Sequence, residues 1–417
     1  MVKLKGMENK ITKIFAEEIN DSRGNPTIKV TVSVSEARPN MLGLASSDIS
    51  DSFSVPSGAS TGAHEAHVIE NSKAILNVNE IIAKALIGQD ILNQKEIDRI
   101  MLELDGTNNK DNLGGNSMIG VSIACAKTAA KVLGVETYEH LRTLMEIKPS
   151  RKTPYLFMNL LEGGKHIHNG FDLAFQEYHI VPETEDVKEA LDIGIKISNT
   201  LKEILQENGS VEVGDEGGDE IKSNDIRKPL ELLIRAIKEN NLENEVHLAL
   251  DVAASSFYEN GKYRIDKKEN TKEELADIYE SLIKEFNLFS IEDPFDEEDF
   301  ESFAKLKQEN DNLFIVGDDL TVTNKILLEK AIEKGSIGAM IIKPNQIGTL
   351  YETLETMRLA RENDIELIVS HRSGETEDAF IADLAFAFNC FGLKAGAPTK
   401  PERMVKYERL IKIINNS

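Results

Sequence analysis

The sequence predicts an α/β protein with a β/α barrel in its C-terminal part and a smaller α+β domain before it. Five short apolar runs between residues 246 and 369 are too short for helices and indicate strands buried on both faces. Amphipathic stretches of helical periodicity lie between these runs, at 271–285, 299–309 and 347–363. Strand and helix alternating at this length favour a parallel sheet, and the number of repeats favours a closed barrel.

Each of the five apolar runs is followed by charged residues. One chemically reactive residue stands out after each run, and these are Asp251, Glu292, Asp318, Lys343 and His371. Because the C-terminal strand ends of such a barrel form one face, we expect these side chains around one mouth. A single acid at a strand end is most simply a solvated residue. Five successive strands that end this way indicate a functional site instead.

The three acids of this group predict a metal site. Carboxylates brought together in a partly dry mouth repel one another and raise their own pKa values unless a cation lies among them. Oxygen ligands without cysteine favour Mg²⁺, which keeps some positions for water or substrate. A lysine beside such a cation is shifted towards its neutral form, as a general base requires. We therefore expect Lys343 to act beside a bound Mg²⁺.

Composition limits the class of protein. A chain of 417 residues can bury a large core and is long enough for two domains. The formal net charge of −24 argues against binding to nucleic acid or to an anionic membrane. Two cysteines without CxxC spacing exclude a disulfide scaffold and a cysteine zinc site. No apolar signal core or run of 18 apolar residues occurs, so we expect a cytoplasmic protein.

The N-terminal part combines a small sheet with helices. Residues 27–34 alternate as a half-exposed strand does, and helices are predicted at 75–87, 94–104 and 117–133. We place the boundary near residue 140, which gives domains 1–140 and 141–417, with 142–152 as the linker. Small residues and two glycines at 55–62 indicate either a mobile loop that closes over an anion or reaches a metal, or a plain surface linker.

The barrel part begins with a buried strand at 155–161 that leads to His166 and His168. Their spacing is a weak metal signal, because zinc sites show a third ligand at recognisable spacing. A substrate contact by His166 is an equal alternative, and His168 is expected at the surface. Residues 175–182 alternate, which puts Glu177 on the face opposite Gln176. After a helix at 187–207, Glu216 precedes two glycines, either in a simple turn or on the active rim.

Long motifs throughout the chain resemble those of the enolase family. In the barrel part they are 214–218 (GDEGG), 249–255 (ALDVAAS), 290–295 (SIEDPF), 317–324 (GDDLTVTN), 342–349 (IKPNQIGT) and 370–378 (SHRSGETED). Three more, 21–26 (DSRGNP), 57–62 (SGASTG) and 396–398 (GAP), extend the resemblance over nearly the whole chain. Motifs of this length in the family's order are highly specific.

The resemblance implies an N-terminal α+β capping domain and a TIM-like barrel whose first units are irregular. It also implies Mg²⁺-dependent, reversible dehydration of 2-phosphoglycerate to phosphoenolpyruvate. The resemblance further implies a Lys or His base that works with one or two Mg²⁺ ions, as is usual in the enolase superfamily. The partner implied is a small phosphorylated carboxylate, and the protein is expected to form a homodimer.

Residue roles follow from the matching positions. The resemblance implies that Asp251, Glu292 and Asp318 bind the tighter Mg²⁺ and that Lys343 removes the C2 proton. Glu216, assisted by Glu177, resembles the acid that expels the C3 hydroxyl, and their proximity would raise one pKa and keep a proton available. The remaining implied positions are Arg372 and Ser373 for the phosphate, His166, Gln176, His371 and Lys394 for other substrate contacts, and Ser60 for a second, substrate-dependent Mg²⁺.

The sequence departs from the family pattern at a few positions. Glu162 stands where Asn is usual, Ile167 where a small residue is usual, and residues 219–220 replace an apolar-Pro pair. These departures motivate a first alternative, a diverged paralogue that dehydrates another phosphoryl or phosphonyl carboxylate. A second alternative is a non-catalytic interaction protein with the enolase fold, because fold does not fix function.

Overall fold

The computed structural model describes residues 9–35, 48–59, 62–207, 209 and 212–416. The chain divides into two compact units. The first comprises residues 1–57, 64–146 and 344–355, and the second comprises 58–63, 147–343 and 356–417. Each unit therefore includes a short segment from the other side of the predicted boundary near residue 140. That domain division stays a prediction.

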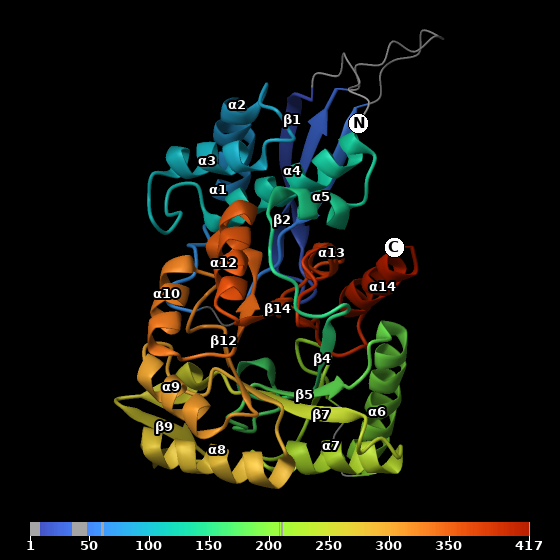
Figure 1. The fold of residues 1–417 in the computed structure, drawn as a ribbon, viewed down its shortest axis with the longest axis vertical. Helices are drawn as coiled ribbons and strands as arrows, with labels where there is room; N and C mark the ends of the chain where they lie inside the picture. Colours follow the sequence, from blue (N-terminus) through green and yellow to red (C-terminus); the bar gives the residue numbers. More distant parts are fainter. Residues whose placement is uncertain (1–8, 36–47, 60–61, 208, 210–211, 417) are drawn as a thin grey trace. The chain divides into compact units, whose positions relative to one another are not determined.

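The first unit contains a three-stranded antiparallel sheet (Figure 1, blue). Its strands, in sheet order, are β1 (Ile11–Asn20), β2 (Pro26–Val34) and β3 (Ile49–Ser54). The alternation predicted at 27–34 is confirmed as β2. Helix α4 (Gly115–Leu133) packs on β2 and β3. A Cβ on Gly120 would lie 2.6 Å from Val30 Cγ2, so this close packing requires glycine.

The other helices of the first unit are short. The helix predicted at 75–87 is a longer run with a π-helical centre, made of α1 (Asn71–Leu76), η1 (Asn77–Ile82) and α2 (Ala83–Leu86). Helices α3 (Gln94–Asp105) and α5 (Thr137–Leu144) also belong to this unit. Within the described residues, no single helix has the length and apolar character to cross a membrane. Helices α4 and α5 pass that test only as a pair, and the chain bends by 108° between them.

Eight strands of the second unit close into a barrel (Figure 1). They are β4 (Tyr155–Glu162), β5 (Glu177–Pro182), β7 (Val246–Asp251), β11 (Ser290–Glu292), β12 (Phe314–Gly317), β13 (Ala339–Ile342), β14 (Glu366–Ser370) and β15 (Gly392–Lys394). Pairing of β15 with β4 closes the ring. The two-residue strand β6 (Asp219–Glu220) adds to β4. The predicted barrel is therefore confirmed.

The irregular start of the barrel is confirmed by the strand directions. Strand β5 is antiparallel to both β4 and β7, whereas the pairs from β7 round to β15, and β15 with β4, are parallel. Because β5 runs the opposite way, its first residue, Glu177, lies level with the last residue of β7, Asp251. The mouth formed by C-terminal strand ends therefore also receives the N-terminal end of β5.

Helices alternate with the strands. They are α6 (Val187–Glu207), α7 (Lys228–Glu239), α8 (Lys272–Phe286), α9 (Phe300–Glu309), α10 (Lys325–Lys334), α11 (Pro344–Ile347), α12 (Leu350–Glu362), α13 (Phe380–Ala387) and α14 (Pro401–Asn416). The helices predicted at 187–207, 271–285 and 299–309 are confirmed as α6, α8 and α9. The helix predicted at 347–363 begins only at Leu350, because Gly348, with φ of 100°, breaks it from α11.

Shorter elements complete the second unit. They are the 3₁₀ turns η2 (Gly164–His166) and η3 (Ala254–Phe257), and a small antiparallel sheet of β8 (Tyr258–Glu259), β9 (Lys262–Ile265) and β10 (Lys268–Asn270).

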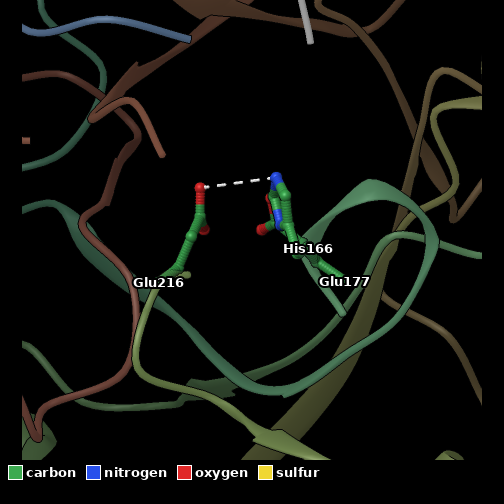
Figure 2. Close-up of side chains that lie close together, drawn as sticks. All are labelled: His166, Glu177 and Glu216. Atoms are coloured by element: carbon green, nitrogen blue, oxygen red, sulfur yellow. Dashed lines mark ion pairs between the residues drawn. The ribbon is translucent and has the colours of Figure 1, made fainter. Parts of the chain in front are cut away.

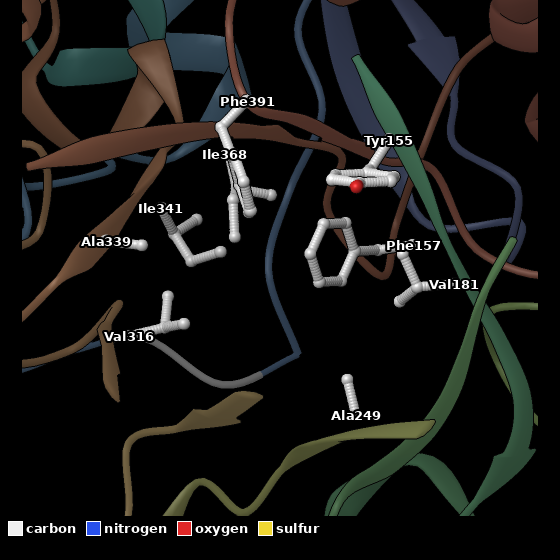
Figure 3. Close-up of a cluster of buried hydrophobic side chains, with 9 residues drawn as sticks. All are labelled: Tyr155, Phe157, Val181, Ala249, Val316, Ala339, Ile341, Ile368 and Phe391. Atoms are coloured by element: carbon white, nitrogen blue, oxygen red, sulfur yellow. The ribbon is translucent and has the colours of Figure 1, made fainter. Parts of the chain in front are cut away.

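Apolar side chains from most of the strands form a core cluster (Figure 3). Its members are Tyr155, Phe157, Val181, Ala249, Val316, Ala339, Ile341, Ile368 and Phe391. The rings of Tyr155 and Phe391 meet edge to face, with centroids 5.3 Å apart. Tyr155 begins β4, whereas Glu162 ends it. The aromatic packing therefore lies towards the strand starts on this side of the barrel, and the acids lie at the other end of the same strand.

Candidate active site

Four carboxylates lie in one register row across neighbouring strands. Glu162 on β4 pairs with Glu177 on β5, which pairs with Asp251 on β7, which pairs with Glu292 on β11. Side chains of register partners lie on the same face of a sheet. All four residues are buried, with at most 4% of each exposed. The barrel therefore concentrates negative charge in a place that water screens poorly.

A lysine lies among these acids. Lys394 Nζ lies 2.8 Å from Asp251 Oδ2, 3.0 Å from both carboxylate oxygens of Glu292 and 3.3 Å from Glu177 Oε2. Burial opposes the charged form of Lys394, but the surrounding acids outweigh it and raise its pKa well above the usual value. An ammonium group therefore balances part of the negative charge of these acids in this structure.

Lys343 is also paired, with Asp318. Burial favours the neutral amine of Lys343, but the charge of Asp318 more than offsets this, so the pKa of Lys343 is raised. The shift of Lys343 towards its neutral form is expected beside a bound divalent ion, so it stays a prediction. A divalent ion on Asp318 would act in the opposite direction.

The donor set still suits a divalent cation. Burial raises the pKa of Glu292 well above its usual value, and the charges of Asp251 and Asp318 add to the effect. A cation shared by these oxygens would relieve that repulsion, and oxygen-only ligands suit Mg²⁺. A second group, Asp293, Asp318 and Asp319, has carboxylate oxygens within 4.8 Å of one another. The mouth therefore contains acidic groups that could hold a metal ion.

Asp293 was not singled out from the sequence. Its carboxylate accepts the backbone N–H of Asp318 at 3.0 Å and that of Asp319 at 2.7 Å. Its own φ of 44° is in the left-handed region, which is uncommon for a residue other than glycine. Asp293 therefore fixes the turn that carries Asp318. Its position directly after Glu292 in the 290–295 motif was the available signal.

A second cluster joins His166, Glu177 and Glu216 (Figure 2), with one ligand atom from each residue within 4.8 Å of the others. His166 Nε2 lies 3.9 Å from Glu216 Oε1, and His166 Nδ1 lies 3.8 Å from Glu177 Oε1. Nδ1 is buried and makes no hydrogen bond to any residue that the structure describes, so it is available to a ligand. His168 has an exposed side chain near Asp215 and lies outside this cluster, as expected of a surface residue.

The proximity of the two glutamates raises one pKa, as predicted, and the residue is Glu177. Burial and the charge of Glu216 raise the pKa of Glu177 to about 8. Burial would also raise the pKa of Glu216, but His371 and His166 outweigh it and hold that pKa well below the usual value. At neutral pH the pair therefore holds a proton, and Glu177 carries it.

His371 is held as a neutral ring by its burial and by its contact with Arg403. Arg403 Nη1 lies 2.6 Å from its Nδ1, and because an arginine only donates, Nδ1 is the acceptor. The hydrogen is then on Nε2, 3.1 Å from Glu216 Oε2. Burial lowers the pKa of His371 to about 4, which agrees with a neutral ring. Arg403, on α14, was missed because no local pattern links residue 403 to this mouth.

All predicted catalytic and substrate-binding residues line one pocket. They are Lys343, Glu216, Glu177, His166, Gln176, His371, Arg372, Ser373 and Lys394. Gln176 Oε1 is buried there without a hydrogen-bond partner in the described part of the chain, as is His166 Nδ1. Ala59 N donates to Ser373 Oγ at 2.5 Å, so the start of the small-residue loop reaches this pocket. The predicted metal contact, Ser60, lies outside the described residues.

A wider cavity elsewhere in the barrel unit, about 400 Å³, is lined by residues that include Val246 and His247 at the start of β7. It contains none of the predicted site residues. We therefore place the chemistry in the narrow pocket at the strand ends, where the titratable groups converge.

The fold and the site define the class of protein. It is a β/α-barrel enzyme that uses acid–base catalysis and has carboxylates at the barrel mouth that could bind a metal ion. The model "Enolase, N-terminal domain" matches residues 11–141, and "Enolase, C-terminal TIM barrel domain" matches residues 150–416. The chain therefore belongs to the enolase family, and the predicted resemblance is confirmed.

Individual relatives agree with this assignment. The enolase of Methanopyrus kandleri is 44% identical over 97% of this chain and 95% of its own length. That of Methanocaldococcus jannaschii is also 44% identical, over 97% of this chain and 94% of its own. The enolase of Nitratiruptor sp. is 43% identical over 97% and 96%. The likeness thus extends through both units.

Proposed function

We propose that this protein is a phosphopyruvate hydratase, a carbon–oxygen lyase that interconverts 2-phosphoglycerate and phosphoenolpyruvate with Mg²⁺. Membership of the enolase family over nearly the full length supports this activity. The main support for the roles of individual residues is that nine predicted catalytic and substrate-binding residues line the same pocket. Neither the paralogue nor the interaction-protein alternative is favoured by a specific observation.

Asp251, Glu292 and Asp318 would hold one Mg²⁺ ion. Lys394 contacts the first two of these acids, so its ammonium group would have to yield to the ion or share the carboxylates with it. When bound, Mg²⁺ supplies positive charge for the carboxylate oxygens of the reacting intermediate. A second, substrate-dependent ion at Ser60 stays a prediction.

Lys343 would accept the C2 proton at Nζ. It follows the last residue of β13, and its backbone N–H donates to Thr323 Oγ1 at 2.9 Å, which fixes where the side chain starts. The ion pair with Asp318 favours the ammonium form. If Asp318 binds a metal ion, its carboxylate no longer stabilises the ammonium form of Lys343. Lys343 can then lose its proton and act as a base.

The carboxyl pair on the other side of the pocket would complete the reaction. The C3–oxygen bond breaks, and the hydroxyl takes a proton from the carboxyl pair and leaves as water. Glu177, with a pKa of about 8, holds that proton at neutral pH. His371 Nε2 lies 3.1 Å from Glu216 Oε2, so its ring would help to keep the carboxylate of Glu216 in position. One proton enters at Lys343 and another leaves the carboxyl pair, so the step is balanced.

Arg372 and Ser373 would bind the phosphate, for which the planar guanidinium fork of arginine is suited. Arg403 donates to the carbonyl oxygens of both residues, at 2.7 and 2.6 Å, and holds their backbone in place. His166 and Gln176 each have a buried polar atom in the same pocket that no described residue hydrogen-bonds, and these atoms would contact the rest of the substrate.

The test is a dehydration assay on the purified protein. With Mg²⁺ and 2-phosphoglycerate, the ultraviolet absorbance of the enol product should rise, and excess EDTA should stop the rise. A flat trace with intact Mg²⁺ binding by calorimetry would favour the paralogue. No heat of Mg²⁺ binding, with or without substrate, would support the non-catalytic protein. The homodimer, which light scattering would test, and the cytoplasmic location stay predictions.

A further inference from the structure

We propose that Glu162 is a positioning residue that holds the turn carrying Glu216 in place for the loss of the C3 hydroxyl. The proposal rests on the proposed function and assigns a role to a position at which this chain departs from the family pattern. Glu162 ends β4 and is fully buried. A carboxyl group in such a place needs partners, and the structure shows which ones it has.

Its partners are two backbone N–H groups of the Glu216 turn. Glu162 Oε1 accepts from Gly218 N at 2.7 Å and from Glu216 N at 3.1 Å. The second oxygen, Oε2, lies 3.3 Å from Glu216 N. A carboxylate that accepts backbone N–H groups is a strong anchor for a turn. The N–H of Glu216 itself is thus tied to β4.

The turn is also shaped around this side chain. A Cβ on Gly214 would lie 2.3 Å from Glu162 Oε2, and one on Gly218 would lie 2.9 Å from Oε1. Both contacts are closer than side chains tolerate, so the glycines on either side of Glu216 make room for the carboxyl group. A side chain at either position would displace the anchor.

The anchor does not depend on the charge of Glu162. Burial raises its pKa well above the usual value, and the nearby charges of Glu216 and Glu177 add to this. Oε1 accepts from both N–H groups, and Oε2 shares only the longer bond from Glu216 N, so Oε2 can carry a proton while Oε1 keeps the turn anchored. A glutamine can make the same two bonds through its single carbonyl oxygen.

Loss of this anchor should affect the departure of the C3 hydroxyl and not the removal of the C2 proton. Glu162 contacts the turn of Glu216, whereas Lys343 is fixed by Thr323 and paired with Asp318. Loss of the anchor should therefore misplace the acid and leave the base in position. A displacement of about 1 Å in a catalytic group can lower a rate about 100-fold.

The experiment measures two rates on the full-length protein with Mg²⁺ and 2-phosphoglycerate. One is kcat for dehydration, and the other is exchange of the C2 hydrogen with D₂O, followed by NMR. Glu162→Met removes both acceptor oxygens but keeps a side chain of similar length. Glu162→Gln keeps the oxygen that anchors the turn. Glu162→Asp shortens the side chain by one methylene and so moves that oxygen away from the turn. Leu160→Ala, a buried change on the same strand, is the control for general destabilisation of β4.

We expect Glu162→Met, or Glu162→Asp if the Met variant does not fold, to lower kcat about 30- to 100-fold with KM changed less than about threefold. C2 exchange should stay within about threefold of wild type, and Glu162→Gln should restore most of kcat. The proposal would be overturned if the rates of dehydration and exchange fell equally, or if kcat fell as much in Glu162→Gln as in Glu162→Met. The same pattern of rates in Leu160→Ala would also overturn it. Failure of the unmodified protein to dehydrate the substrate would instead contradict the proposed function.

Discussion

Lys394 Nζ lies 2.8 Å from Asp251 Oδ2, inside the row of buried acids at the barrel mouth. The two residues are separated by 143 positions in the sequence. The ammonium group lies within ion-pair distance of Asp251, Glu292 and Glu177, and Asp251 is also a predicted metal ligand. A metal ion and Lys394 would therefore compete for, or share, the same carboxylate oxygens.

Replacing this lysine should make the protein more dependent on Mg²⁺. Lys394→Met leaves Asp251, Glu292 and Glu177 without their ammonium partner, and breaking a buried pair this way costs about 3–5 kcal/mol. We expect a lower melting temperature in EDTA and a larger rise on adding Mg²⁺ than in wild type. Calorimetric melting curves with and without Mg²⁺ measure both.

The matched control is Lys406→Met, which breaks a different buried pair, Lys406 with Glu375 at 2.7 Å. It should lower the melting temperature equally in EDTA and in Mg²⁺. An equal Mg²⁺ response in Lys394→Met and wild type would show that Lys394 and the metal do not share ligands.

The base role of Lys343 predicts a specific loss. Lys343→Ala should abolish exchange of the C2 hydrogen with solvent, because no other lysine is predicted to reach that proton. Removal of an ammonium group next to Asp318 should leave Mg²⁺ binding intact or stronger by calorimetry. Exchange retained at a wild-type rate would remove Lys343 from this role.

Asp293 should matter for metal affinity without being a required ligand. Asp293→Ala removes the acceptor for the N–H groups of Asp318 and Asp319, so the turn that carries Asp318 loses its anchor. Groups that orient a ligand typically contribute about 10- to 100-fold in metal affinity. We expect weaker Mg²⁺ binding of that size by calorimetry, with partial recovery in Asp293→Asn. Unchanged affinity in the Ala variant would refute the orienting role.

Because of Asp98, which lies in the first unit, the free energy of unfolding of the protein should fall as pH rises. It is fully buried, and burial raises its pKa from 3.8 to about 7, although hydrogen bonds from Ser122, Tyr351 N and Gln94 oppose the shift. Between about pH 4 and 7 the folded state keeps a proton that the unfolded state has released. Stability from this group is therefore present at low pH and is lost as pH rises through 7.

The test of Asp98 compares wild type with Asp98→Asn by urea unfolding at pH 5 and pH 8. Asparagine can still accept from Tyr351 N and can donate to Gln94 Oε1, which is buried and has no hydrogen-bond partner among the described residues. We expect the free energy of unfolding of wild type to fall by roughly 2–3 kcal/mol more than that of the variant between these pH values. Parallel changes in the two proteins would show that Asp98 titrates at its ordinary value.

Local patterns were enough for most of the barrel. The apolar runs predicted β7, β11, β12, β13 and β14, because a strand buried on both faces needs only a few apolar residues in succession. Strand β15 was missed, since Gly392 to Lys394 is too short to show a period. The break between α11 and α12 was missed too, because the sequence does not reveal that Gly348 adopts a left-handed conformation.

The sequence alone determined the chemical groups and the strand ends that carry them, because strand periodicity and turn residues are local properties. Tertiary structure decided which groups meet. The reversed direction of β5 put Glu177 beside Asp251, closure of the barrel brought Lys394 among the acids, and α14 brought Arg403 to His371. Charge balance in a buried site depends on distances between residues far apart in the chain, and these distances exist only once the barrel has closed.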